Sequence, residues 1–108
     1  MLKNIITKLG LKSDTDPTII KLVNSGATLI DVRTTREFSG GSAVGSNNIP
    51  YNQLKSRLSE LKSESAIVVF CRSGFRSGKA KNMLLENNFT NVENGGTWKV
   101  IKKIQEKK

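Results

Sequence analysis

The stretch AIVVFCRSGFRSGKA, residues 66–80, predicts a strand, a tight loop and the start of a helix in direct succession. Its first five residues, 66–70, are all apolar, which is typical of a buried strand. The only cysteine of the chain, Cys71, follows this run, and we expect a loop over 71–76 and a helix over 77–87. A buried strand that leads through a short loop into a helix is the repeating unit of α/β proteins, so this stretch decides the fold class.

The rest of the chain alternates in the same way. Residues 28–32 (TLIDV) form a second apolar run, and a brief strand over 91–93 precedes an Asn-Gly-Gly turn over 94–96. Helical spacing and capping residues predict helices over 2–11, 17–26, 34–38, 54–61 and 98–105, with a loop over 39–48. We therefore expect an α/β three-layer sandwich, with a mostly parallel sheet between helices. We divide the chain into a short N-terminal amphipathic segment, residues 1–15, and one domain, residues 16–108.

Composition indicates a soluble, folded domain. The chain has 108 residues, of which 36% are hydrophobic and 25% charged, enough apolar content for one core. No apolar run approaches the roughly 18 residues of a membrane span, and the first residues lack the pattern of a signal peptide. A single cysteine cannot form an internal disulfide, so we expect a cytoplasmic protein. We also expect a monomer.

The chain contains no histidine, which excludes several kinds of site. Ser-His-Asp and Cys-His catalytic pairs are ruled out, and so are zinc sites that use histidine. One cysteine leaves no thiolate cluster in their place, so we expect no metal. Any activation of Cys71 must come from backbone dipoles and cationic side chains.

The net charge of +9 comes from 18 basic and 9 acidic residues. Basic residues cluster near both ends of the chain and over 72–81. The simpler interpretation of these basic clusters is a solvated surface. The more specific interpretation is contact with nucleic acid or an acidic membrane. Aromatic residues are few and do not alternate with the basic ones, so we do not expect nucleic-acid binding.

Three features of the loop after Cys71 favour the thiolate over the thiol. The residue stands at the carboxyl end of a strand, where ligands of parallel sheets bind, and Gly74 lets the loop turn its N–H groups toward one point. The following helix adds the positive end of its dipole. Arg72 and Arg76 flank the sulfur, and no acidic residue occurs between Ser65 and Leu85 to pair with them.

A thiolate beside an anion site suits attack on phosphorus or on a sulfane sulfur. Cysteine phosphatases place five residues between the cysteine and the arginine that closes their loop. Four residues separate Cys71 from Arg76, which makes a tighter cradle that favours a single sulfur over a phosphate.

Four motifs of this sequence resemble the rhodanese family of sulfurtransferases. The loop CRSGFR (71–76) is similar to that family's six-residue active loop, Cys-Arg-x-Gly-x-Arg/Thr. LIDVRTTREF (29–38), GGSAVGSNNIP (40–50) and NVENGGTW (91–98) resemble three further family segments, so the likeness runs from about Pro17 to Trp98. The sequence departs from the family at Ser42, where the family has His, and in the shortened spacing from Gly-Gly to Trp98.

The resemblance implies a single-domain sulfurtransferase with a five-stranded parallel sheet. Cys71 would take sulfane sulfur from a small anionic donor such as thiosulfate, and the persulfide would pass it to cyanide or a thiol, including a protein thiol. Backbone N–H groups would cradle the persulfide, and Arg72 and Arg76 would hold the donor's sulfonate. The resemblance implies no metal or organic cofactor. The implied substrate-binding residues are Arg72, Ser73, Gly74, Phe75, Arg76 and Ser77.

Other interpretations of the same residues remain open. A lone cysteine is often an inert core residue. The domain is alternatively a non-catalytic rhodanese-fold binding module, or a cysteine phosphatase or arsenate reductase. Phe75 belongs either to the core or to the rim of the site, and we expect Trp98 to pack in the core. In the family, the pair equivalent to Asp31 and Arg33 supports the fold near the site.

Overall fold

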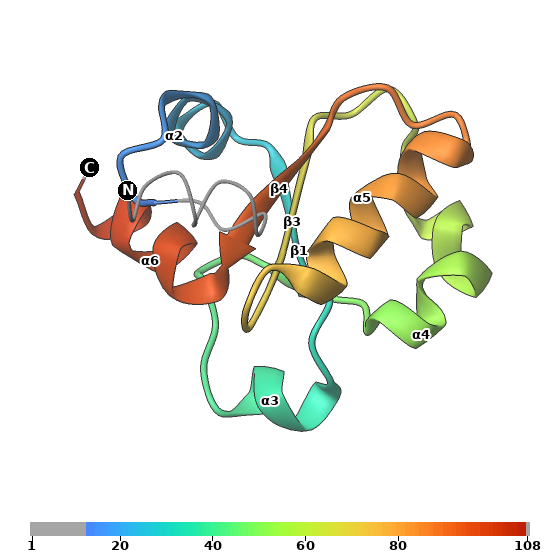
Figure 1. Cartoon of the computed structure of the whole chain (residues 1–108), viewed down its shortest axis with the longest axis horizontal. Helices are drawn as coiled ribbons and strands as arrows, with labels where there is room; N and C mark the ends of the chain where they lie inside the picture. The colour runs from blue at the N-terminus through green and yellow to red at the C-terminus, as the bar shows by residue number, and fades with distance from the viewer. Residues whose placement is uncertain (1–12, 108) are drawn as a thin grey trace.

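The computed structural model describes residues 13–107, so the helix expected over 2–11 lies outside the described residues. The described elements form an α/β domain around a parallel sheet (Figure 1). In chain order they are α2 Pro17–Asn24, β1 Thr28–Asp31, α3 Thr35–Ser39, β2 Asn47–Asn48, α4 Tyr51–Leu54, the 3₁₀ helix η1 Lys55–Glu60, β3 Ile67–Cys71, α5 Phe75–Glu86, β4 Val92–Thr97 and α6 Trp98–Glu106. The strand order is β2-β1-β3-β4, and every neighbouring pair is parallel.

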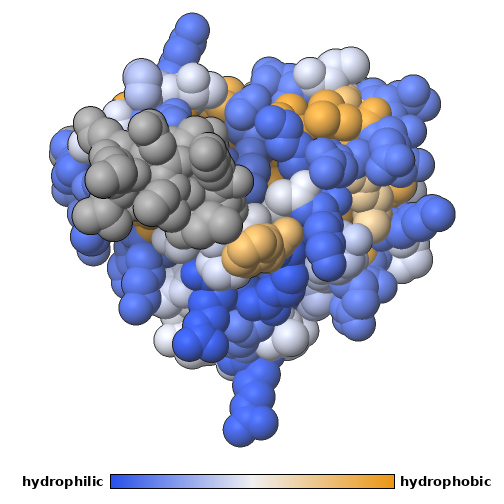
Figure 2. Space-filling model, viewed as in Figure 1, coloured by the Kyte–Doolittle hydropathy of each residue, from blue (hydrophilic) through white to orange (hydrophobic). Residues whose placement is uncertain are grey.

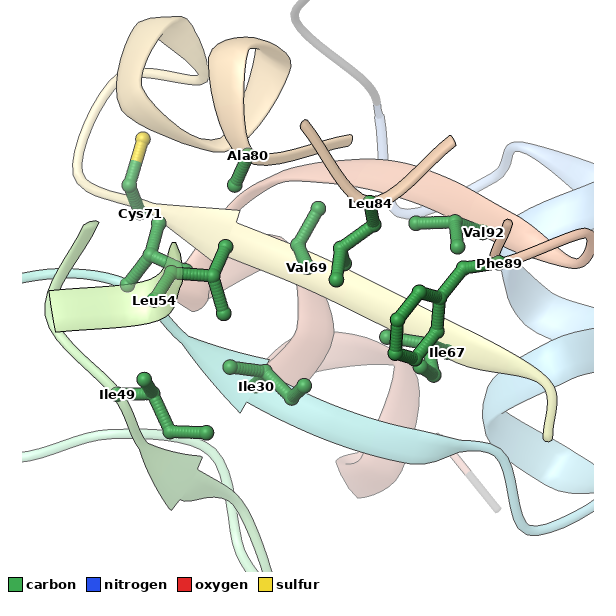
Figure 3. Packing of buried hydrophobic residues seen from close by; sticks show 11 residues of the cluster. Ile30, Ile49, Leu54, Ile67, Val69, Cys71, Ala80, Leu84, Phe89 and Val92 are labelled. Atoms are coloured by element: carbon green, nitrogen blue, oxygen red, sulfur yellow. The ribbon is translucent and has the colours of Figure 1, made fainter. Parts of the chain in front are cut away.

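The sheet is the middle one of three layers, as expected. Helices α2 and α6 lie on one side of it, and α4 and α5 lie on the other (Figure 1). All five residues of β3 are buried, because side chains that alternate along this strand reach two separate cores. Val68 and Phe70 pack with α2 and α6, whereas Ile67, Val69 and Cys71 pack with α4 and α5 (Figure 3).

The local signals at the start of the domain are confirmed. Asp16 caps α2 through a hydrogen bond of 3.1 Å from the N–H of Ile19 to its carboxylate, and Pro17 takes the first helical position. The helix expected over 54–61 begins earlier, at Tyr51, and continues as the 3₁₀ helix from Lys55. Within the described residues, no helix is long and apolar enough to cross a membrane.

The sheet differs from the sequence-based expectation in strand number. Within residues 13–107 it has four strands, not five. One of them, β2, falls inside the segment expected to be a loop, 39–48, and pairs with Ile30 and Asp31 through two asparagines. Its polar residues lie at the sheet edge and carry no apolar pattern, so the sequence does not distinguish it from a loop.

The last strand corrects a second prediction. The expected turn over 94–96 lies inside β4, which runs through it to Thr97. A bulge against β3 accommodates the glycines, because Val69 pairs with Asn94 and the next residue, Phe70, pairs with Gly96. Gly95 must lack a side chain here, since a Cβ atom would lie 2.7 Å from Val68 Cγ1.

We expect Gly95→Ala to destabilise the fold by about 1–3 kcal/mol, because the added methyl group overpacks the core under α6. Its Cβ would also lie 2.8 Å from Ile101 Cδ1. Thermal unfolding measures the loss as a drop in Tm of roughly 4 °C or more. The matched control is Gly40→Ala, at an exposed position where the nearest atom to a Cβ is 3.4 Å away. An equal drop for both variants would contradict the overpacking argument.

Candidate active site

Cys71 is the last residue of β3, and its side chain is fully buried. The N–H of Gly74 donates a hydrogen bond of 3.0 Å to Cys71 Sγ. The hydroxyl oxygen of Ser77 lies 3.3 Å from the same sulfur. The sulfur is therefore held between the loop and the first turns of α5, at the carboxyl end of a central parallel strand.

Helix α5 begins at Phe75, two residues earlier than the expected start at Ser77. Gly74 precedes it with φ +97°, a left-handed conformation that glycine adopts without the penalty a Cβ brings. The loop between strand and helix is therefore only Arg72, Ser73 and Gly74. Phe75 and Arg76 stand in the first helical turn, where N–H groups have no partner within the helix. This places the positive end of the α5 dipole at the sulfur.

These contacts shift the acidity of the thiol. Burial raises the pKa of Cys71. Hydrogen bonds from the Ser77 hydroxyl and from the N–H groups of Ser77, Ser73 and Gly74 together lower this pKa by more than burial raises it. The net result is a pKa below the ordinary value for cysteine. Hydrogen bonds that stabilise the charged form therefore outweigh desolvation, as a nucleophilic thiolate requires.

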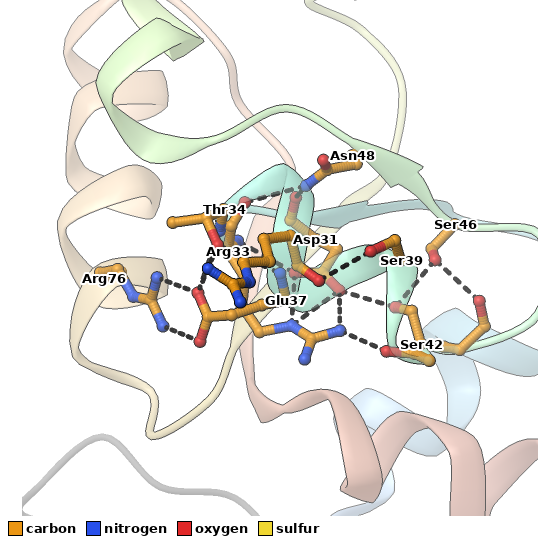
Figure 4. A network of polar contacts seen from close by, with 12 residues as sticks. Asp31, Arg33, Thr34, Glu37, Ser39, Ser42, Ser46, Asn48 and Arg76 are labelled. Carbon is orange, nitrogen blue, oxygen red and sulfur yellow. Dashed lines mark hydrogen bonds and ion pairs between the residues drawn. The ribbon is translucent and has the colours of Figure 1, made fainter.

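The expectation that neither flanking arginine has an ionic partner is wrong for Arg76. Its guanidinium donates two hydrogen bonds to Glu37, of 2.7 and 3.1 Å (Figure 4). Glu37 comes from α3, where it also forms a capping box with Thr34. The hydrogen bonds from Arg76 lower the pKa of Glu37 from 4.5 to about 2; burial opposes this shift and Thr34 assists it. The pair ties α3 to the start of α5 and neutralises one of the two expected anion-binding groups.

Asp31 and Arg33 form a buried ion pair beneath this region (Figure 4). Arg33 Nη2 donates to Asp31 Oδ2 over 2.7 Å and to the carbonyl of Gly41 over 2.6 Å. Ser42, which stands where the resembled family has His, donates to Asp31 Oδ2 over 2.7 Å. Ser42 therefore helps to satisfy the buried carboxylate.

A pocket of about 400 Å³ opens beside the cysteine loop. Cys71 itself does not line the pocket, because its sulfur is closed off by the loop. The pocket combines three basic side chains with one carboxylate and one aromatic ring, and its walls come from the segment after β1, from α3, from the cysteine loop and from the β4–α6 junction. Its lining residues are Arg33, Glu37, Arg72, Thr97, Trp98 and Lys99.

Sequence reasoning missed part of this pocket. Trp98 packs against the core with α2 and α6, as expected, but it is only half-buried and also lines the pocket, with the Arg33 guanidinium 4.8 Å from its ring centre. Glu37, Thr97 and Lys99 were not expected near the site. The signal that points to Thr97 and Lys99 is their position at the carboxyl end of β4 and just after it, and the turn predicted over 94–96 hid that strand end.

The structure brings all seven expected residues, 71–77, to one end of the sheet but gives them different surroundings. Ser77 and Gly74 are buried, Arg72 is exposed beside the pocket, and Phe75 is 59% exposed. Phe75 therefore does not belong to the core. The surrounding face of the molecule is largely hydrophilic, with apolar residues in small separate patches (Figure 2). Among residues 13–107, no group of three potential metal ligands comes together.

The fold and the site define a parallel α/β domain with a hydrogen-bonded cysteine at the carboxyl end of a central strand. The family model of the rhodanese-like domain matches residues 16–97. The chain belongs to this family.

Two relatives and two solved structures illustrate the likeness. The chain is 42% identical to the uncharacterized protein YqhL of Bacillus subtilis (strain 168), over 76% of this chain and 67% of that protein. It is 35% identical to the thiosulfate sulfurtransferase PspE of Escherichia coli (strain K12), over 67% of this chain and 71% of the relative.

The human single domain sulfurtransferase TSTD1 superposes with a TM-score of 0.73 at 26% identity, covering 90% of this chain and 96% of that one. A rhodanese with anions from E. coli superposes with a TM-score of 0.66 at 32% identity, covering 69% and 91%. The homologues thus include single-domain sulfurtransferases.

We expect Glu37→Gln to change how stability depends on pH. Because the folded pKa of Glu37 is about 2 and its ordinary value is 4.5, ionised Glu37 stabilises the fold above pH 4.5 and loses this effect as pH falls toward 2. The pair is partly exposed, so the difference in unfolding free energy is about 1 kcal/mol at neutral pH. Urea unfolding of both proteins from pH 7 to pH 2 should show this difference shrinking to zero.

The control for this series is Glu86→Gln, at an exposed position at the end of α5. It should leave the pH dependence unchanged. A constant offset between Glu37→Gln and the wild-type protein at every pH would contradict an ionic origin.

Proposed function

We propose that this protein is a sulfurtransferase that carries sulfane sulfur on Cys71, from a donor such as thiosulfate to a thiophilic acceptor. One observation carries the proposal: Cys71 Sγ sits at the end of β3, among N–H donors that stabilise the thiolate, directly beside a cationic pocket. The relative PspE, described as a thiosulfate sulfurtransferase, supports the choice of donor.

The first step is a nucleophilic displacement at sulfur. The Cys71 thiolate attacks the outer sulfur of thiosulfate, an S–S bond to Cys71 forms, and the bond from that sulfur to the sulfonate breaks. Sulfite leaves with the electron pair of the broken bond. Backbone N–H groups from Arg72 to Ser77 would then cradle the persulfide, and three of them, those of Ser73, Gly74 and Ser77, already stabilise the thiolate.

Arg72 is the better candidate for the sulfonate of the donor. It lines the pocket, and within residues 13–107 it makes no ion pair. Arg76 is engaged by Glu37, so we assign it first to holding α3 against the site. Because Cys71 is buried, the loop must move for the donor to reach the sulfur.

The second step returns the enzyme to its starting form. Cyanide or a thiolate attacks the outer sulfur of the persulfide, and the Cys71 thiolate leaves. Both steps exchange nucleophiles at sulfur, so they need no metal or organic cofactor. A persistent thiolate suits a reducing compartment, and we propose a cytoplasmic monomer.

The test is to incubate the purified protein with thiosulfate and weigh it by intact-mass spectrometry. We expect a gain of one sulfur atom, its removal by cyanide, and steady production of thiocyanate. No gain of sulfur together with no turnover would overturn the proposal and favour a binding module. Hydrolysis of an aryl phosphate at a comparable rate would favour a cysteine phosphatase instead.

A further inference from the structure

A chain of buried polar groups runs from the candidate nucleophile into the last strand. Ser77, on α5, has its hydroxyl oxygen 3.3 Å from Cys71 Sγ and 2.7 Å from Asn94 Oδ1. Ser77 is fully buried and Asn94 is 8% exposed. Gly96 donates its N–H to the same Oδ1 over 2.9 Å, which fixes the asparagine side chain at the bulge of β4. The sulfur is therefore linked through one hydroxyl to an amide that does not touch it.

The hydroxyl of Ser77 has one hydrogen and two near acceptors, Cys71 Sγ and Asn94 Oδ1, while the carbonyl of Gly96 is farther away at 3.5 Å. When Cys71 is a thiol, its S–H donates to Ser77 and the Ser77 O–H donates to Asn94, so every group is satisfied. When Cys71 is a thiolate, it has no hydrogen to give, and the strongest bond available to the Ser77 O–H is the one to the charged sulfur. Asn94 Oδ1 then keeps the N–H of Gly96. Ionisation of the cysteine thus requires the hydroxyl to turn away from Asn94.

We propose that Asn94 is a positioning residue that competes with Cys71 for the Ser77 hydroxyl, and thereby limits the fraction of Cys71 present as thiolate. The competition follows from the short Ser77–Asn94 distance and from the burial of all three groups, which excludes water as a substitute partner. The importance of this coupling for sulfur transfer rests on the proposed function. After sulfur is loaded, the inner sulfur of the persulfide is uncharged and the hydroxyl returns to Asn94.

Asn94 also reaches the cysteine loop directly, and this second path must be separated from the first. Its Nδ2 donates to the carbonyl of Gly74 over 3.1 Å, and Gly74 in turn donates its N–H to the sulfur. Loss of Asn94 loosens this path whether or not Ser77 is present. The path through the hydroxyl exists only when Ser77 is present, so a double-mutant cycle distinguishes the two.

The charged groups around the sulfur are the same in all four proteins of the double-mutant cycle. Arg76 on α5 interacts electrostatically with Cys71 and with Asp31, and Glu37 on α3 pairs with Arg76. Arg33, two residues after β1, pairs with Asp31, and Arg72 follows Cys71 in the loop. None of these side chains is altered in the variants.

The experiment titrates the thiolate in wild type, Ser77→Ala, Asn94→Ala and the double variant. Thiolate absorbance and the rate of alkylation by iodoacetamide report Cys71 alone, because it is the only cysteine. Ser77→Ala should raise the titration midpoint by about one pH unit, because a donor to the thiolate is lost. Asn94→Ala should lower it by roughly half a unit when Ser77 is present and should not lower it when residue 77 is Ala.

The inference is overturned if Asn94→Ala has the same effect with and without Ser77, or if it raises the midpoint when Ser77 is present. Circular dichroism first establishes that each variant is folded. If Asn94→Ala does not fold, Asn94→Asp replaces it, since a carboxylate keeps the acceptor and binds the hydroxyl more strongly. Asn94→Asp should then raise the titration midpoint of Cys71 more in the wild-type background than in the Ser77→Ala background. An equal rise in the two backgrounds overturns the inference.

The titration needs no sulfur donor, so its outcome is independent of turnover. A protein that shows the coupling but never gains sulfur would refute the proposed function alone. A protein that transfers sulfur but shows no coupling would refute the role of Asn94 alone.

Discussion

We expect Cys71→Ala to reduce thiocyanate formation from thiosulfate and cyanide to background, about a thousandfold or more below the wild-type rate. In the proposed mechanism the sulfur atom of Cys71 itself forms the bond to the transferred sulfur, and no second cysteine exists in the chain to replace it. The intact mass of the variant should stay constant in thiosulfate, whereas the wild-type mass rises by one sulfur atom. Both measurements use the same two protein preparations.

The loss must be separated from a loss of fold, because Cys71 is also part of the core with α4 and α5. Removal of one buried sulfur should cost about 1 kcal/mol, which leaves the domain folded at room temperature. The control is Lys79→Ala, an exposed position on α5 outside the site, which should retain most of the activity. Turnover by Cys71→Ala at more than a few per cent of the wild-type rate would place the transferred sulfur on another group.

The sequence predicts the part of the fold in which local pattern and tertiary environment agree. The apolar runs that become β1 and β3 are buried strands, and Asp16 begins a helix as its capping chemistry requires. Cys71 is therefore placed correctly at a strand end before any coordinates are known. The alternation of strands with helices then specifies the layers, since parallel neighbours need crossover helices.

The errors occur where distant contacts decide the structure. Strand β4 contains Asn94, Gly95 and Gly96, which locally favour a turn. They form a strand because β3 pairs with them and because Gly95 lets Val68 and Ile101 pack against the backbone. No local pattern in the sequence encodes that fit. Because the strand was predicted as a turn, neither Asn94 nor the pocket residues at the end of β4 could be recognised as part of the site.

The ion pairs of the site likewise depend on contacts between residues far apart in the sequence. The capping box of Thr34 and Glu37 can be recognised in the sequence, and it places Glu37 at the start of a helix. The partner of Glu37 is 39 residues away, at Arg76, and only the parallel arrangement of β1 and β3 brings the two together. Two arginines that look equivalent in the sequence therefore differ in the structure, since Arg76 is paired and Arg72 faces the pocket.

Asp31→Ala should destabilise the domain by about 3–5 kcal/mol, because it leaves the guanidinium of Arg33 buried without its counter-charge. The carboxylate of Asp31 accepts hydrogen bonds from the backbone and side chain of Arg33 and from Ser42, and it is fully buried. After its removal, Arg33 keeps only the carbonyl of Gly41 and the face of Trp98. Thermal unfolding should show a Tm lower by roughly 12 °C or more.

A surface pair of the same length provides the control for burial. Arg57 and Glu60 also lie 2.7 Å apart, but they are largely exposed, so Glu60→Ala should cost less than about 1 kcal/mol. Replacing both buried partners, in Asp31→Leu with Arg33→Met, should recover much of the stability lost in Asp31→Ala, because no unpaired charge remains. If the double variant is less stable than Asp31→Ala, the penalty does not come from an unpaired guanidinium, and the pair stabilises the fold through its hydrogen bonds to Gly41 and Ser42.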